Sequence, residues 1–169
     1  MEKIKDRITL GVVVGIAANL IKQGLSFLFK ELGWSTITPD KKAGGIFLSR
    51  KKTKQPEGKI LGIIADFCIA CKLAILLVFL ISSTGKDNHL LKGLSGSSTA
   101  WIVMYGFLSR IGGTGFSIIR PKDAITSLLT HAVFGLVASQ LIVTLGDESL
   151  FQPKYQTLSN PSSEELFTY

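Results

Sequence analysis

The sequence is poor in charge, in cysteine and in histidine. Asp, Glu, Lys and Arg make up 18% of the 169 residues, below the roughly 25% that is usual for soluble domains. Two cysteines and two histidines supply neither a disulfide framework nor the ligand cluster of a structural metal site. No Ser-His-Asp or paired-carboxylate arrangement can be assembled from the residues. We therefore expect no enzyme activity, no catalytic residue, no metal and no cofactor.

The chain has apolar residues instead, and they are gathered in long blocks. Hydrophobic residues make up 46% of the sequence, and mean hydropathy is +0.37. About 20 apolar residues span a bilayer as a helix, and four blocks approach or reach this length: residues 8–32, 59–83, 93–111 and 124–145. We predict an all-α integral membrane four-helix bundle in the cell membrane. Residues 1–146 would form a single transmembrane domain, and residues 147–169 a polar, flexible tail.

Small and polar residues recur along the first block at spacings of three and four, which places them on one helical stripe. Gly11 and Gly15 form a small-xxx-small pair on this stripe, a pattern that lets another helix backbone approach closely. An amphipathic helix lying in the membrane interface is the alternative for this block. The block at 93–111 is the least apolar, so it depends on packing against other helices or enters the membrane as a re-entrant segment.

A basic connector, residues 33–58, joins the first two blocks. We expect its cations, with one just beyond its end, to face anionic headgroups of the bilayer: Lys41, Lys42, Arg50, Lys51, Lys52, Lys54 and Lys59. No recognition fold accompanies this run, so nucleic acid is not an expected partner. Ten Lys and Arg residues on the connector side against six on the other place the connector in the cytoplasm. Lys3, Lys5 and Arg7 before the first block argue for the opposite orientation, which stays open.

Several polar side chains lie inside the predicted spans at similar depth. Counting about 1.5 Å per residue from the connector side places Lys22 about 15 Å deep, and Asp66 and His131 about 10 Å deep. Gln23 and Tyr105 are close to the same level. One hypothesis is a centre of Asp66 and His131 for proton or ion handling, with Lys22 as counter-charge. The alternative is an Asp66–Lys22 pair that holds the helices in register while His131 is hydrogen-bonded.

A second and deeper polar group would contain Asn19, Lys72 and Gln140. Lys72 lies about 120° around the helix from Asp66 by the 3.6-residue turn. It therefore points elsewhere and either snorkels toward the interface or meets a partner subunit. Asp123, just before the last block, is expected to cap that helix.

Cys68 and Cys71 form a C-x-x-C pair inside the second block. Redox chemistry requires an accessible and electropositive environment, and an apolar span provides neither. We expect the two cysteines to act as small buried hydrophobic residues.

Two runs stand out, LLKGLSGSSTAWIVMYG at 90–106 and THAVFG at 130–135. Together with the Gly-rich first block, they resemble small four-span membrane proteins from uncharacterised families of Gram-positive, often spore-forming, bacteria. The resemblance implies a membrane location and four spans, and it carries no activity.

The sequence thus predicts a multi-pass membrane protein of structural, accessory or assembly type that acts through helix–helix interaction. Its partner would be a second copy, forming a homo-oligomer, or another membrane protein. The alternative is a small proton- or ion-coupled transporter or channel subunit that uses the buried Asp, His and Lys side chains. A dry and fully paired polar layer would favour the first function, and a hydrated path through the layer would favour the second.

Overall fold

The computed structural model describes residues 3–49, 51–108 and 120–151. Within these ranges the chain is helical and contains no strand, which confirms the all-α prediction. The longer helices are α1 (Arg7–Glu31), α3 (Pro56–Thr84), α4 (His89–Trp101) and α5 (Pro121–Leu145). The short elements are α2 (Pro39–Gly44), η1 (Lys52–Lys54), the π-helical η2 (Ile102–Leu108) and η3 (Glu148–Leu150).

Three helices, α1, α3 and α5, are long and apolar enough to cross a membrane. Their bounds agree with the predicted blocks to within three residues at each end, because the apolar blocks are flanked by helix-starting prolines or polar residues. α4 has only 13 residues, and η2 continues it for seven more. The last residues of the predicted third span, 109–111, lie outside the described residues.

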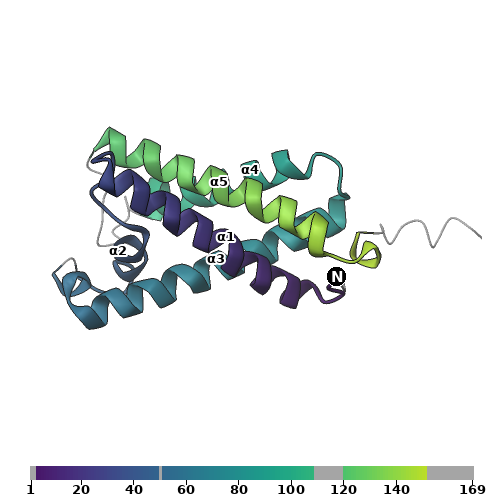
Figure 1. Ribbon diagram of the computed structural model, residues 1–169, viewed down its shortest axis with the longest axis horizontal. Coiled ribbons are helices and arrows are strands. Elements are labelled where there is room, and N and C mark those ends of the chain that lie inside the picture. Colours follow the sequence, from purple (N-terminus) through teal and green to yellow (C-terminus); the bar gives the residue numbers. More distant parts are fainter. Residues whose placement is uncertain (1–2, 50, 109–119, 152–169) are drawn as a thin grey trace, which may run out of the picture.

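The four longer helices pack in the order α3, α1, α5, α4 (Figure 1). α1 packs along α3 on one side and along α5 on the other, and α4 packs along α5. α3 and α4 contact each other over only a short length, so the seam between these two helices is the open side of the bundle. The two described ends of the chain meet, because the backbone N–H of Ile4 donates to the carbonyl of Leu145 at 2.9 Å.

The α1–α3 interface is held at close range by glycine. A Cβ atom on Gly15 would lie 2.6 Å from the Cα of Cys71, and one on Gly11 would lie 2.5 Å from Cγ1 of Ile75. Neither position accepts a side chain without moving the helices apart. The predicted small-xxx-small contact on the first block is therefore confirmed, and its partner is α3.

Large apolar side chains cover the outer surface of the bundle, while polar side chains lie inside. Leu76 is 65% exposed, Phe27 61% and Ile125 58%, whereas Asn19 and Ser139 are fully buried. A water-soluble protein rarely leaves so much contiguous apolar surface uncovered. This distribution agrees with the membrane-spanning length and composition of α1, α3 and α5.

The basic connector is partly folded into the bundle. α2 packs on α3, and Gly62 provides the space, because a Cβ there would collide with the carbonyl oxygen of Asp40. Lys42 on α2 is consequently buried. The prediction that Lys42 faces lipid headgroups is therefore wrong, because the glycines of α3 admit α2 against the bundle.

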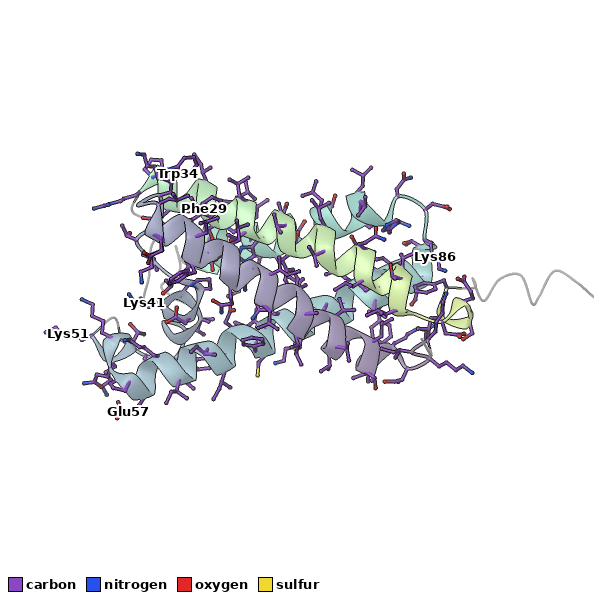
Figure 2. The ribbon with its side chains drawn as sticks, in the orientation of Figure 1. Phe29, Trp34, Lys41, Lys51, Glu57 and Lys86 are labelled. Atoms are coloured by element: carbon purple, nitrogen blue, oxygen red, sulfur yellow. The ribbon has the colours of Figure 1, made fainter. Side chains whose placement is uncertain are left out.

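The other connector cations remain at the surface. Lys41 is half-buried, and four lysines are exposed: Lys51, Lys52, Lys54 and Lys59. Figure 2 shows Lys41, Lys51 and Glu57 at one end of the molecule and Lys86 at the other. Arg50 lies outside the described residues.

The first residues of the predicted tail are folded. Leu150 and Phe151 are buried against the core, and the Lys86 ammonium donates to both oxygens of Glu148 at 2.6 Å. The flexibility predicted for residues 152–169 concerns a part of the chain outside the described residues.

The cysteines differ from their expected role. Cys68 is exposed on the outer surface of α3, because it is two residues, or about 200°, from Asp66 on the inner face. Cys71 is half-buried, and its Sγ lies 3.8 Å from the carbonyl oxygen of Val12. The prediction of two buried cysteines is therefore wrong for Cys68.

Candidate functional site

Asp66 is the centre of a buried hydrogen-bond cluster. The Lys22 ammonium donates to its Oδ1 at 2.8 Å. The amide nitrogens of Asn19 and Gln23 donate to its Oδ2 at 2.9 and 2.8 Å. The three donors occupy positions i, i+3 and i+4 of α1, so one helix face supplies all of them. We call these four residues the Asp66 cluster.

The Asp66 cluster joins three helices. Asp66 is 6% exposed and Lys22 is 5% exposed, and the Lys22 ammonium also lies 5.9 Å from the ring centroid of Phe134 on α5. Removing one partner of such a buried ion pair costs about 3–5 kcal/mol, because the other charge is left without compensation. The cluster therefore fixes α1 and α3 in register and orients both toward α5.

His131 lies beside the Asp66 cluster without bonding to it. Its Nδ1 is 2.8 Å from the backbone carbonyl oxygen of Ser127, so Nδ1 carries the proton and donates. Its ring meets that of Tyr105 edge-on at 5.7 Å between centroids. Both oxygens of Asp66 are occupied by α1 side chains, and no hydrogen bond in the described residues links Asp66 to His131. The structure thus brings Lys22, Gln23 and Asp66 into direct contact and leaves His131 nearby.

Two small cavities adjoin the Asp66 cluster. The inner chamber has a volume of about 40 Å³ and is lined by Lys22, Asp66, Phe134 and others. The outer chamber has a volume of about 20 Å³ and is lined mainly by hydroxyl-bearing and aromatic residues. Lys42, Tyr105 and His131 line both chambers. At about 10–15 Å³ per water, the two chambers have room for only a few water molecules.

Lys42 enters this region from the connector. Its ammonium lies 4.9 Å from the ring centroid of Tyr105. Burial lowers the pKa of Lys42 from 10.5 to about 8, and repulsion from Lys22 adds to the shift, although Asp123 and Asp66 partly oppose it. At neutral pH the side chain is protonated, so the site contains two buried ammonium groups.

Asp123 fixes the connector to α5. Its Oδ1 accepts from the backbone N–H of Thr36 at 2.7 Å, and its Oδ2 accepts from the Thr36 hydroxyl at 3.0 Å. The helix itself begins earlier, at Pro121, with Arg120 in the N-cap position and no side-chain cap. The expectation that Asp123 caps this helix is wrong, because its carboxylate is buried against the loop that follows α1.

The predicted second polar group does not exist as a group. Asn19 belongs to the Asp66 cluster. Gln140 is exposed and pairs through Oε1 with His89 at 3.1 Å and through Nε2 with Thr144 at 3.3 Å. Lys72 is exposed on a different face of α3. Depth counted along the sequence separated these residues from Asp66. Depth alone does not show which helix faces are in contact.

Lys72 lines a cavity of about 800 Å³ between α3 and α4, which we call the α3/α4 groove. Its wall is mostly apolar, with hydroxyl groups from Ser95 and Thr99 and a second lysine, Lys92. Ile69, Leu73 and Met104 form a wall common to the groove and the inner chamber.

Sequence reasoning missed two residues of this region, Lys42 and the loop-binding role of Asp123. The available signal was the pair Gly58 and Gly62 on the same face of α3 as Asp66. Small residues on one helix face are ordinarily a sign of packing between membrane spans. Gly58 and Gly62 instead admit the connector, because a Cβ on Gly58 would collide with the backbone of Lys52.

No protein-family model, no curated protein and no solved structure matches the chain. The chemistry of the site therefore carries the functional argument. Within the described ranges, no group of three His, Cys, Asp or Glu side chains is placed to hold a metal ion. Asp66, Lys22 and Asp123 form ion pairs or hydrogen bonds, whereas Oδ1 of Asn19, the Ser82 hydroxyl and Nε1 of Trp101 are buried without a hydrogen-bond partner. The α3/α4 groove offers a mostly apolar surface for binding.

Proposed function

We propose that the chain is a multi-pass protein of the cell membrane with four spans, the third formed by α4 and η2. The outward apolar side chains on all four longer helices support this arrangement. A further support is that Ile4 forms backbone hydrogen bonds with Leu145 and Asp147 at one end of the bundle, as an even number of crossings requires. The short α4 would be tolerated because α5 covers one side of it along its length.

Within that membrane, the protein acts as an accessory or assembly factor that holds a helix of a partner in the α3/α4 groove. The observation that carries this proposal is the groove itself, a mostly apolar cavity of about 800 Å³ where α3 and α4 pack less extensively than the other neighbouring helices. Transmembrane helices associate by close packing and by hydrogen bonds between helices. The groove provides both, because it combines leucine side chains with serine, threonine and glycine.

The Asp66 cluster supports this role and not a catalytic one. Its carboxylate accepts hydrogen bonds from three donors, which suits a structural role in holding α1 and α3 together. A rigid α1–α3–α5 core would then present the two walls of the groove at a constant spacing. The function involves no chemical step.

Site-specific photo-crosslinking in native membranes tests the proposal. A photo-reactive residue at Thr99, inside the groove, should give a protein adduct of one defined mass, and the same residue at Ile125, which is exposed on α5, should give lipid adducts. Filling the groove by Ala100→Phe should abolish the Thr99 adduct, while the matched change Val12→Phe on the exposed face of α1 should leave it. Lipid adducts alone at both positions would overturn the proposal.

A second candidate is a small ion-coupled transporter or channel subunit, and the two chambers favour it. Lys42, Tyr105 and His131 line both chambers, so polar groups continue from the Asp66 cluster toward the connector. Reconstituted Asp66→Asn protein distinguishes the candidates. Loss of proton or ion flux with intact folding would support transport. Loss of stability without an effect on flux would support a structural role for the Asp66 cluster.

A further inference from the structure

Lys72 lies near the middle of α3, far from both ends of the helix. By a rise of about 1.5 Å per residue, it is roughly 24 Å from Pro56 and roughly 18 Å from Thr84. A hydrocarbon core about 30 Å thick, centred on this helix, places Lys72 within a few ångströms of the midplane. Its four-carbon stem is too short to bring the ammonium to the headgroups.

No described carboxylate compensates this charge. The ion pairs of the described residues involve Lys3, Lys22 and Lys86, and none involves Lys72. An isolated lysine at the centre of a membrane helix is energetically costly. The Lys72 side chain lies at the α3/α4 groove, so an occupant of the groove is in position to supply the missing charge.

The α4 wall of the groove suits a helix as occupant. Ser95 and Thr99 line the groove, are exposed and form a small-xxx-small pair, whereas Gly96 beside them already packs against Leu77 of α3. Such pairs allow a second helix backbone to approach closely, and their hydroxyl groups bond across the interface. A lipid chain gains nothing from small residues, so the wall favours a helix.

The described carboxylates of a second copy are not placed to supply the charge that Lys72 lacks. Asp66 lies well inside α3, and Asp123 lies in the first turn of α5. Both are buried and hydrogen-bonded. The remaining described acids lie outside the helices or in their terminal turns: Asp6, Glu31, Asp40, Glu57, Asp87, Asp147 and Glu148. None of these meets Lys72 at mid-membrane depth in a symmetric pair.

We propose that the α3/α4 groove binds a transmembrane helix of a different protein, and that this helix carries an Asp or Glu near the membrane midplane that pairs with Lys72. This inference rests on the proposed helix-binding function and specifies its partner. Binding pairs the Lys72 charge with the acidic charge of the partner helix. Neither charge is then left uncompensated in lipid, so both proteins are more stable in the membrane.

Synthetic helices in lipid vesicles provide the test. The probes are Leu/Ala helices of about 23 residues with Glu, Gln, Lys or Leu at the central position. Energy transfer between a labelled probe and the labelled full-length chain reports binding. The Glu helix should bind about tenfold more tightly than the Leu helix, as expected for one strong interhelical contact. Lys72→Leu should remove this preference, and Lys72→Glu should transfer it to the Lys helix.

Two matched variants separate this inference from the function on which it rests. Lys59→Leu changes another exposed lysine of α3, at the end of the helix, and should leave the Glu preference unchanged. Ala100→Phe should block all probes. Equal binding of Glu and Leu helices, both blocked by Ala100→Phe, would overturn the role of Lys72 and leave the groove function standing.

Two other outcomes are also decisive. Failure of every probe to bind, or binding that Ala100→Phe does not change, would remove both the partner and the groove function. Self-association of the chain in the same vesicles, abolished by Ala100→Phe, would show that the occupant is a second copy and would overturn the assignment to a different protein.

Discussion

Asp66 and Lys72 lie six residues apart on α3 and have opposite surroundings. Asp66 faces α1, where glycines bring the backbones together and three side chains donate to its carboxylate. Lys72 faces the α3/α4 groove, where the two helices pack less extensively than the other neighbouring pairs. One face of α3 is therefore completed by the chain itself, whereas the other is the face that we propose binds a different molecule. Whether a protein compensates a charge within its own membrane helix indicates whether that charge serves its fold or the binding of another molecule.

The largest effect is expected from Asp66→Ala. The change leaves the Lys22 ammonium buried without its carboxylate, which should lower the free energy of unfolding by about 3–5 kcal/mol. Steric trapping in bicelles measures this value. The double variant Asp66→Leu with Lys22→Met removes both charges and should recover most of the loss. An Asp66→Ala protein as stable as the wild type would contradict a structural role for the Asp66 cluster.

Gly15→Leu should be the next most damaging change. A Cβ at Gly15 already meets the backbone of Cys71, so the larger side chain forces α1 and α3 apart at a cost of about 3 kcal/mol. The matched control is Gly24→Leu on the same helix, where a Cβ meets nothing within 4 Å. Thermal unfolding should show the control unchanged or slightly more stable, because leucine favours a helix over glycine. Equal behaviour of the two variants would exclude a close α1–α3 approach.

Lys42 should make stability depend on alkaline pH. Because burial lowers its pKa from 10.5 to about 8, the unfolded chain binds more protons than the folded chain between these two values. The free energy of unfolding should therefore rise with pH across this window, by on the order of 3 kcal/mol. Lys42→Met should abolish the rise. A profile that is flat in the wild type, or equally steep in the variant, would place the titration elsewhere.

The smallest effect on the isolated chain is expected from Lys72→Leu. The side chain is exposed and has no ion-pair partner among the described residues, so the free energy of unfolding should change by less than about 0.5 kcal/mol. Lys22→Leu, in the Asp66 cluster, should lower the free energy of unfolding several times more. A loss of more than about 1 kcal/mol for Lys72→Leu would mean that the bundle uses this lysine and that the two faces do not differ.

Much of the fold was predictable from the sequence, because long apolar blocks specify α1, α3 and α5 almost to the residue. Counting depth from the helix ends also placed Lys22 and Asp66 at a comparable level. These inferences depend on local composition and on the regular rise of a helix. They require no knowledge of which helices are neighbours.

The parts that were missed depend on contacts between helices. The six residues of α2 are too few to give a helical pattern, and the burial of Lys42 depends on space that Gly62 provides later in the chain. Asn19 was assigned to a deeper group than Asp66, although its amide donates to the Asp66 carboxylate, because depth counted along one helix does not show which side chains of two helices meet. The loop-binding role of Asp123 follows from the position of Thr36, which local sequence does not predict.

The pairing of Ile4 with Leu145 and Asp147 sets an order of events during synthesis. α1 and α3 are made first and can pair Lys22 with Asp66 as a hairpin, before α5 has left the ribosome. The backbone N–H of Ile4 finds its acceptor at Leu145 only when α5 is complete. The N-terminal residues therefore stay without these backbone partners until α5 has been made.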